Sequence, residues 1–558
     1  MIVDLFLMGK DPNQSSLKID IDRVDDLDAL KVKVASRFNI VVPNSIDFQD
    51  QAGRQLLDIE DVLDCPEAVG ILVDGHSVRE PSGPKGLPFA GAYYEVFPDH
   101  VGNHERMFHR FGGVIKYTTY GRDNYLTRDP RVAEVAFAES PFFTKATSNP
   151  NHPLHPISNQ NSLFICDTNE NWRIAHRFIA PALNPKAIRH YHPILQSVVE
   201  SSFPVFDELD EQGEAFNTYQ YMMKLASGAI GQCALGMDLH HFDSIDAPVH
   251  DLVTSIQKTL QLNKKVASKG DWYAKVPFGD PKELDRTQKH VVQLLNDAFD
   301  TCPKSGDEDL PINEAALRAA CIFDYLNRAV DDAGQKLLGS SLRPTCSQVR
   351  DNIVGAGFVT TACLLSWLIY SLCTYEGTQD RLLQELVDHG VTHDTTWDPD
   401  FADSLPYLNK FIKETQRLHN PSFQPGRVAK VDCVVPGGYQ LPKGAALIIA
   451  LYAIHSNPDI WDNPHRFDPD RWDHFNPKDK PKCSYIPFGT GPRSCIGFNF
   501  ALGEVKVVLP SLVYRYEFVR EGETSIEYDP QYQLIRPMNL YIRAKKRTHW
   551  PKPSAAPA

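Results

Sequence analysis

The feature that most constrains this chain of 558 residues is a glycine-rich loop around a single cysteine near the C-terminal end. The loop reads F-G-T-G-P-R-S-C-I-G over residues 488–497, and a helix is predicted directly after it, over about 500–514. Glycines allow tight turns and close backbone approach, and backbone N–H groups at a helix N-terminus stabilise a thiolate. The Cys495 sulfur is therefore predicted to be a metal ligand rather than a structural thiol.

The fixed positions of this loop, F-x-x-G-x-R-x-C-x-G, resemble the haem-ligand signature of the cytochrome P450 family of haem-thiolate enzymes. The resemblance implies a mainly α fold with small β-sheets, haem b (iron protoporphyrin IX) as the cofactor and Cys495 as the iron ligand. It also assigns other loop residues to the cofactor site: Phe488, Gly489, Arg493 and Gly497.

Two further segments occur in the order and spacing of that family and resemble its Glu/Arg/Arg triad. Glu414 and Arg417 lie three residues apart on one predicted helix face, and Arg471 follows within F-D-P-D-R-W. Buried charges need partners of this kind, so the triad is expected to hold the cysteine loop in place and not to contact substrate. On local sequence alone, Glu414 and Arg417 would form a solvated pair that contributes about 0.2–0.5 kcal/mol.

The segment N-W-R-I-A-H-R, residues 171–177, resembles the helix that crosses one edge of the haem in this family. Trp172 and His176 lie one turn apart on one face and are assigned as donors to the haem propionates. Arg427 and Arg493 are the charged partners of the same carboxylates. A plain surface histidine is the alternative for His176. The longer string that begins here resembles the soluble fatty-acid hydroxylases of bacteria and fungi.

A long apolar helix with G-A-G-F-V-T-T at its centre is predicted from about residue 345 to 375. The resemblance implies that Ala356 and Gly357 let this helix approach the haem and that Thr360 assists proton delivery to dioxygen. The family's usual carboxylate before this threonine is replaced by Val359, so the proton path and the choice of O2 or a peroxide as oxidant stay open. Without the resemblance, Thr360 would hydrogen-bond the carbonyl one turn back.

Substrate contacts are also assigned from the resemblance. Phe164, within S-L-F, precedes the Trp172 helix in a loop that family members fold over the haem, so it is expected to line the substrate pocket together with Ala356. An ordinary core phenylalanine is the alternative for Phe164. Such pockets are assembled from loops far apart in the chain, so the sequence does not name the substrate.

The N-terminal segment has a pattern of its own. Its apolar periodicity predicts the strand, strand, helix, strand, strand order of a small α+β β-grasp domain. Residues 50–58, D-Q-A-G-R-Q-L-L-D, then resemble the corresponding hairpin of ubiquitin. No free di-glycine tail follows, so a docking or solubility module with a protein partner is expected rather than a conjugated tag. The predicted boundaries are a ubiquitin-like domain at 1–76, a Pro/Gly-rich linker with few contacts at 77–88, a catalytic domain at 84–548 and a flexible tail at 549–558.

Charge and cysteine content narrow the class of protein. The chain has 57 Lys+Arg against 71 Asp+Glu, a formal net charge of −14, so nucleic acid is not an expected partner. The eleven cysteines are scattered without a C-x-x-C pair, which is typical of a reducing compartment. Neither a signal peptide nor a transmembrane anchor is predicted, which indicates a cytoplasmic protein. The basic stretch at 264–269, followed by Trp272 and Tyr273, is either a contact with a membrane surface or a solvated loop.

The favoured function is therefore that of a haem-thiolate monooxygenase acting on a lipophilic small molecule, a lipid or a secondary metabolite. No dinucleotide-binding glycine motif follows a predicted strand, so electrons are expected from a separate NADPH-dependent flavoprotein reductase. One alternative is an enzyme of this fold that rearranges a peroxide, uses a peroxide as oxidant or reduces nitric oxide. Another is a non-catalytic haem or interaction protein.

Overall fold

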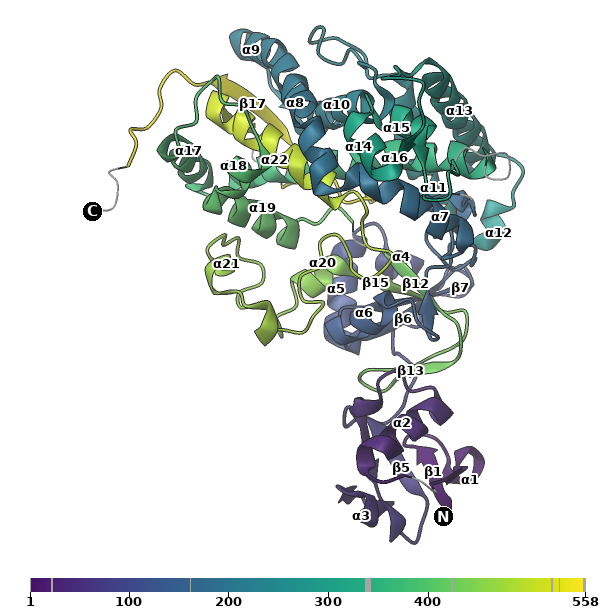
Figure 1. Cartoon of the computed structure of the whole chain (residues 1–558). Coiled ribbons are helices and arrows are strands. Elements are labelled where there is room, and N and C mark those ends of the chain that lie inside the picture. The colour runs from purple at the N-terminus through teal and green to yellow at the C-terminus, as the bar shows by residue number, and fades with distance from the viewer. Residues whose placement is uncertain are drawn as a thin grey trace. The chain divides into compact units, whose positions relative to one another are not determined.

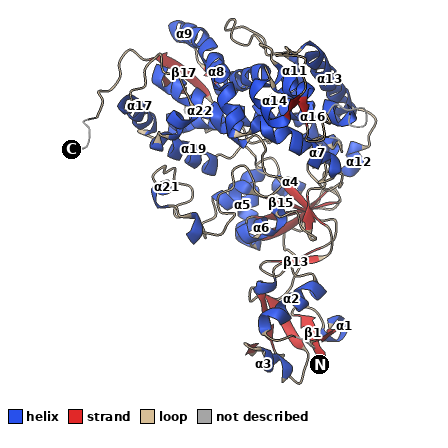
Figure 2. Cartoon of the chain, in the orientation of Figure 1, coloured by secondary structure: helices blue, strands red, loops and turns tan. Residues whose placement is uncertain are grey.

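The computed structural model describes residues 2–21, 24–160, 162–336, 343–422, 425–522, 525–530 and 532–554 (Figure 1). Its contacts divide the chain into two compact units. The first unit combines Met1–His152, Gln424–Ile454 and Pro477–Arg493, and the second combines Pro153–Phe423, His455–Asn476 and Ser494–Ala558. The second unit is mainly helical, whereas the first contains most of the strands (Figure 2).

A five-stranded sheet at the start of the first unit has the strand order β2-β1-β5-β3-β4. Strand β1 runs antiparallel to β2 and parallel to β5, and helix α2 supplies Leu30 and Val34 to the core beneath them. This is the predicted β-grasp topology, while the likeness to ubiquitin itself stays a prediction. The elements are β1 (Ile2–Leu7), α1 (Pro12–Ser15), β2 (Leu17–Asp20), α2 (Leu27–Phe38), β3 (Ile46–Gln49), β4 (Gln55–Leu56), α3 (Ile59–Leu63) and β5 (Val69–Val73).

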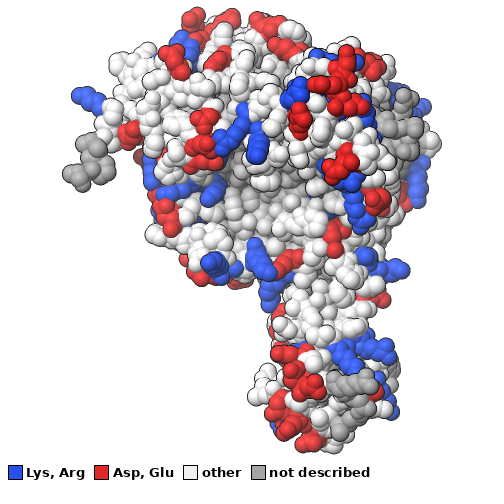
Figure 3. All heavy atoms as spheres, in the orientation of Figure 1, with Lys and Arg blue, Asp and Glu red and all other residues white. Residues whose placement is uncertain are grey.

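Local chemistry explains where these elements begin and end. Val3, Leu5 and Leu7 alternate into the core, which is the period-two pattern of a strand with one buried face. Helix α2 begins where the Asp26 side chain accepts a hydrogen bond from the Ala29 N–H at 2.8 Å, and it ends at Asn39, whose φ of 54° is left-handed. Acidic side chains gather on one side of this part of the first unit (Figure 3).

The segment predicted to be a linker with few contacts is held along its length, so that expectation is wrong. The Val78 N–H donates to the Met8 carbonyl at 2.7 Å, and the Val78 side chain belongs to the core of the N-terminal sheet. Further along, the Lys116 N–H donates to the Ser82 carbonyl at 3.0 Å. The cause is physical: the extended backbone pairs with neighbouring strands instead of with water. The domain boundaries themselves stay a prediction.

The second sheet of the first unit has the order β6-β7-β15-β12-β8, with β15 parallel to β7 and its other pairs antiparallel. Strand β12 lies between β15 and β8 and carries Arg427. A separate antiparallel hairpin, β13-β14, is inserted between β12 and β15 in the chain. The elements are α4 (Tyr93–Val96), α5 (His100–Phe111), β6 (Val114–Thr119), β7 (Arg122–Thr127), α6 (Pro130–Phe137), β8 (Phe143–Thr144), β12 (Gly426–Ala429), β13 (Cys433–Val435), β14 (Tyr439–Leu441), β15 (Ala446–Ile449) and α20 (Leu451–His455).

The second unit is built around the long helix α16, which packs against α10, α13, α19 and α22. Its prediction from about residue 345 to 375 is confirmed by the observed bounds Arg343–Thr374. The helices are α7 (Glu170–Ile179), α8 (Pro185–Ser201), α9 (Phe203–Gln212), α10 (Thr218–Ile230), α11 (Asp251–Ser268), α12 (Asp271–Ala274), α13 (Asp280–Thr301), α14 (Ile312–Arg318), α15 (Ile322–Arg328), α17 (Thr378–Asp388), α18 (Pro399–Asp403), α19 (Pro406–Leu418), α21 (Arg471–His474) and α22 (Phe498–Arg515).

Small sheets complete the second unit. Strands β9 (Phe216–Asn217), β16 (Tyr516–Glu521) and β17 (Tyr541–Lys546) form a three-stranded sheet in the order β16-β17-β9, and β10 (Leu310–Pro311) pairs with β11 (Ala329–Val330). The predicted architecture, mainly α with small β-sheets, is confirmed.

One segment of the described chain, Ile353–Thr374 in α16, is long and apolar enough to cross a membrane, with a mean hydropathy of 1.8. However, 72% of its most apolar stretch is buried inside the protein, as in the core helix of a soluble domain. Length and composition alone are weak evidence for a membrane span.

Candidate functional site

The cysteine loop needs glycine at two positions. Gly489 and Gly491 have φ values of 70° and 74°, in the left-handed region that favours glycine. At Gly491 a Cβ atom would lie 2.3 Å from the carbonyl oxygen of Phe137, so a side chain there would displace the backbone. Phe488, Gly489 and Arg493 belong to the first unit, whereas Cys495 and Gly497 belong to the second.

Cys495 lies three residues before helix α22, whose N-cap is Gly497. The residue is accessible on one side, yet protein atoms crowd the sulfur enough that burial raises the pKa of its thiol. The Gly497 N–H donates to the sulfur and lowers that pKa, but burial is the larger effect. Two opposing effects thus act on the thiol, and a bound metal cation would favour its ionised form.

Arg427 on β12 has a buried side chain with a donor that no described residue accepts. It is 1% exposed, and burial, with a smaller contribution from Arg493, lowers the pKa of its guanidinium to about 10, which Glu139 opposes. Its Nη1 donates to the Gly426 carbonyl at 2.9 Å, and its Nε lies 3.7 Å from a Glu139 oxygen. No described residue hydrogen-bonds its Nη2. A buried guanidinium with a spare donor beside a second arginine fits an anionic group such as a haem propionate.

Trp172 and His176 share one face of α7, as predicted. The Asn169 side chain caps this helix by accepting from the Trp172 N–H at 2.8 Å. The two ring centroids are 5.3 Å apart, Trp172 is nearly buried and His176 is half-buried. The plain surface histidine considered for His176 is therefore disfavoured.

The centre of α16 presents a short accessible face on an otherwise buried helix. Ala356 is exposed and Thr360 is half-exposed, and the Thr360 Oγ1 donates to the Ala356 carbonyl at 3.0 Å. This bond is the one expected of any threonine in a helix, and it leaves the hydroxyl's acceptor lone pairs available. The accessible face of α16 therefore presents a methyl group next to a hydroxyl.

Two features at the centre of α16 were not expected. Gly357 is partly exposed, and a Cβ there would be 2.4 Å from Ile230 Cδ1, so this glycine also lets α10 approach α16. Val359 is 1% exposed and belongs to the hydrophobic core. A carboxylate at position 359 would be buried without an evident partner, so Val359 is a core residue here rather than a vacant proton relay.

Glu414, Arg417 and Arg471 form a buried network, so the alternative of a solvated pair is excluded. Glu414 and Arg417 have fully buried side chains and are joined by two hydrogen bonds of 3.0 and 2.9 Å. The Arg471 Nε donates to the same carboxylate at 2.9 Å, and Trp472 Nε1 at 3.2 Å. Arg417 also donates to the carbonyls of His455 and Pro464 at 2.8 and 2.7 Å. Every contact of the network named here lies within the second unit.

Phe164 lies in the irregular segment before α7 and is 49% exposed. The alternative of an ordinary core phenylalanine is therefore excluded. A half-exposed aromatic ring in a loop is suited to contact a ligand, although its place in a pocket stays a prediction.

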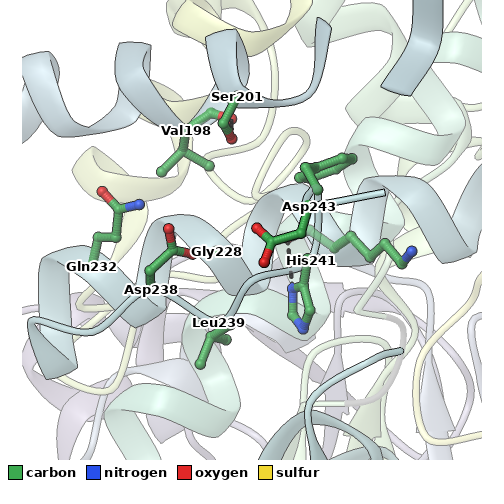
Figure 4. Close-up of a pocket in the computed structure, with 10 residues that line it drawn as sticks. Val198, Ser201, Gly228, Gln232, Asp238, Leu239, His241 and Asp243 are labelled. Carbon is green, nitrogen blue, oxygen red and sulfur yellow. Dashed lines mark hydrogen bonds between the residues drawn. The ribbon is translucent and has the colours of Figure 1, made fainter. Parts of the chain in front are cut away.

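A separate pocket lies in the second unit and was not predicted (Figure 4). Its volume is about 50 Å³, and its lining includes Lys224, Asp238, His241 and Asp243. The Lys224 Nζ donates to the Ala247 carbonyl at 2.9 Å, and burial lowers the pKa of His241 to about 4. The pocket is too small and polar for a lipophilic substrate.

Sequence reasoning also missed Glu504 on α22. Its side chain is fully buried, and neither carboxylate oxygen accepts a hydrogen bond from a described residue. Burial raises the pKa of this carboxyl well above its ordinary value. Its position within an apolar helix pattern is the one signal that could have identified it.

We expect Glu504→Gln to be more stable than the wild type at neutral pH. The ordinary pKa of a glutamate side chain is about 4.3, and above this pH the unfolded chain releases the Glu504 proton while the folded protein keeps it. The free energy of unfolding of the wild type therefore falls as the pH rises above about 4.3. The difference in the free energy of unfolding between the variant and the wild type should be near zero at about pH 4. It should grow by about 1.4 kcal/mol per pH unit until the raised pKa of Glu504 is reached. Denaturant unfolding at several pH values checks this. Parallel pH dependences of the two proteins would contradict it.

Comparison with known proteins agrees with this geometry. The family model for cytochrome P450 matches residues 81–542. The relative "Cytochrome P450 monooxygenase alnD" from Emericella nidulans is 47% identical over 555 residues, which is 99% of both chains. The human "Cytochrome P450 4F3" is 27% identical over 394 residues, or 68% of this chain and 73% of its own. The mouse "Leukotriene-B4 omega-hydroxylase 3" is 26% identical over 395 residues, with the same two shares of 68% and 73%.

These matches place the chain among the haem-thiolate oxidoreductases. It belongs to the cytochrome P450 family, and it is a monooxygenase of that family with haem b as its cofactor.

Proposed function

We propose that this enzyme inserts one oxygen atom of O2 into a lipophilic small molecule, a lipid or a secondary metabolite. The observation that carries the proposal is the accessible face of α16, where the Ala356 methyl group and the Thr360 hydroxyl interrupt a buried helix. The mouse relative, named for an omega-hydroxylation of leukotriene B4, supports a lipid-like substrate. The fungal relative is named only as a monooxygenase.

The haem site combines an iron ligand, a shaped loop and several donors for the propionates. We assign Cys495 as the iron ligand, with Phe488, Gly489 and Gly497 shaping the loop. Arg427, Arg493, Trp172 and His176 are assigned to the propionates, and the spare Arg427 donor supports this. When bound, the haem supplies the activation of dioxygen. The triad of Glu414, Arg417 and Arg471 is assigned to holding the surrounding fold.

Electrons are assigned to a separate NADPH-dependent flavoprotein reductase, because the chain has no dinucleotide-binding glycine motif after a strand. The peroxide-using alternative is kept because the core residue Val359, next to Thr360, cannot relay a proton. Turnover with NADPH and a reductase, compared with turnover on a hydroperoxide alone, separates the two functions. A screen of lipids and polycyclic compounds for a low-spin to high-spin shift of the haem identifies the substrate class. Failure of every lipophilic compound to shift the spin state would contradict the proposal.

We further propose a cytoplasmic enzyme whose α12 region touches a membrane surface. Trp272 and Phe278 are exposed on either side of the end of α12. The basic stretch itself is less exposed than predicted, because Lys264 is buried and the Lys269 Nζ pairs with Asp280 at 3.2 Å. The apolar side chains therefore support this contact better than the charges do.

Thr360→Ala is expected to lower the fraction of NADPH electrons recovered in product by about tenfold or more, because the hydroxyl assists proton delivery. Turnover on a hydroperoxide should change little. Thr361→Ala is the matched control, since Thr361 is buried and its hydroxyl donates to the Gly357 carbonyl at 3.1 Å. Measurement of NADPH consumption against product checks this. An equal fraction of NADPH electrons recovered in product by the two variants would show that the Thr360 hydroxyl does not assist proton delivery.

Phe164→Ala is expected to change the product distribution or the substrate-induced spin shift while haem content stays normal, since its half-exposed ring contributes little to the core. The control is Phe178→Ala on α7, a fully buried ring whose loss should cost about 3–5 kcal/mol. Product analysis by chromatography and haem content measured together check this. Loss of folding in Phe164→Ala with unchanged regiochemistry in the residual enzyme would contradict the assignment.

A further inference from the structure

The hairpin formed by β13, its turn and β14, residues 433–441, is bonded at two places within the first unit, to the N-terminal sheet domain and to the segment directly after it. At the first, the Val41 N–H donates to the Val434 carbonyl at 2.9 Å, and the Val434 N–H donates to the Asn39 carbonyl at 2.9 Å. The Val434 side chain is 2% exposed and belongs to the core of the N-terminal domain. That core is therefore incomplete without a residue nearly 400 positions later in the chain.

The second place is Arg79, whose main chain and side chain both bind the 433–441 hairpin. Its N–H donates to the Gly438 carbonyl at 2.9 Å, and its carbonyl accepts from the Gln440 N–H at 2.8 Å. The guanidinium donates to the Gly437 carbonyl at 2.9 Å and lies 4.4 Å from the centroid of the Tyr439 ring. Backbone pairing on both sides of one residue is the pattern of a strand added to a sheet edge.

The acidic residue Asp74 hydrogen-bonds the turn of the hairpin. One Asp74 carboxylate oxygen accepts from the Gly437 N–H at 2.8 Å and pairs with the Arg131 guanidinium at 3.1 Å. The turn also needs glycine: Gly438 has a φ of 74°, and a Cβ there would lie 2.9 Å from the Ser77 carbonyl oxygen. The contact with the hairpin thus combines backbone pairing, an apolar insertion and a carboxylate that accepts a hydrogen bond from the turn.

We infer that the N-terminal domain is a fixed part of the folded enzyme that holds the 433–441 hairpin, and is not a module on a flexible tether. The hairpin is joined to β12 by three residues, and β12 carries Arg427, so the domain also restrains the strand that bears this arginine. Without the domain, Val434 and the strand edges at the hairpin would face water, which favours local disorder or aggregation. A truncated chain that lacks this domain is therefore not expected to behave as an intact catalytic domain.

The comparisons agree with a domain that is part of the enzyme. The fungal relative matches over 99% of both chains, so the match includes the N-terminal residues, whereas the family model begins at residue 81. The domain is thus an addition to the common fold, shared at least with this relative.

The test uses the full chain and the double variant Asp74→Ala/Arg79→Ala, with Asp64→Ala/Arg54→Ala as the control. The control pair lies in the same domain and makes the same change of charge. Both of its side chains are exposed, and Arg54 pairs with Asp50 at 3.3 Å and with Asp61 at 3.7 Å, both in the same domain rather than in the hairpin. Hydrogen–deuterium exchange of peptides covering 433–441 is the readout. We expect exchange at least tenfold faster in the double variant than in wild type and control, together with faster release of haem.

Two results would overturn the inference. One is equal exchange of 433–441 in the double variant and the wild type. The other is rapid cleavage of the native wild type by trypsin after Arg79, because protection is expected where both main-chain groups of that residue are bonded. The proteolysis needs no variant, so it decides the matter even if the double variant does not fold. Neither readout depends on the substrate or on catalysis.

Discussion

Arg417→Ala is expected to yield almost no soluble, haem-loaded enzyme. Arg417 is fully buried, makes two hydrogen bonds to the Glu414 carboxylate and donates to carbonyls of two later segments, at His455 and Pro464. Removal of the arginine leaves a buried carboxylate with less charge compensation and several carbonyls without a donor. Breaking such a pair costs about 3–5 kcal/mol, which is a large part of the stability of a typical domain.

Arg381→Ala is the matched control, because Arg381 forms a two-bond pair with Asp470 at the surface of the same unit. Exposed pairs contribute about 0–1 kcal/mol, so this variant should load haem normally. The yield of haem-loaded protein and the thermal midpoint are the measurements. A soluble, fully loaded Arg417→Ala enzyme with altered substrate affinity alone would show that the network serves the pocket and not the fold.

Cys495→Ala is expected to abolish the red-shifted Soret band that a carbonyl adduct of a haem-thiolate protein shows. Cys495 is an exposed residue that follows two turns requiring glycine and lies three residues before helix α22. Burial raises the pKa of its thiol. An iron bound here would favour the thiolate, and an alanine side chain cannot replace the sulfur as its ligand.

Cys483→Ala provides the comparison for this result. Cys483 lies twelve positions upstream and is buried, and burial raises the pKa of its thiol to about 11, as expected of a structural cysteine. This variant should keep the red-shifted band. Persistence of the band in Cys495→Ala, or its loss in Cys483→Ala, would place the ligand elsewhere.

The sequence was most informative where function depends on short, fixed spacing. Cys495 and the helix after it, and the Glu414 and Arg417 pair, are separated by a few residues, so local geometry and family resemblance determine their arrangement. Trp172 and His176 followed in the same way from one helical turn. The β-grasp order of the N-terminal segment was predictable because each strand has its own apolar alternation.

The errors came from contacts between residues far apart in the chain. A Pro/Gly-rich composition suggested a free linker, but Arg79 pairs with a hairpin more than 350 positions away. The contact of Gly357 with Ile230 and the burial of Val359 in the core were likewise not predictable from the sequence. Composition and periodicity predict which residues can be buried, but they do not predict which distant residues will pack against them. The spare donor of Arg427 could likewise be recognised only once its partners were known.

Turnover under ¹⁸O2 is the decisive test of the proposed oxygen insertion. The purified enzyme is given NADPH, a flavoprotein reductase and a lipophilic compound that shifts its haem to high spin, and the product is analysed by mass spectrometry. We predict one ¹⁸O atom in each product molecule, no label from H2¹⁸O, and consumption of NADPH that depends on the reductase. Product formed from a hydroperoxide alone, with no label from ¹⁸O2 when NADPH and reductase are present, would contradict the proposed monooxygenation.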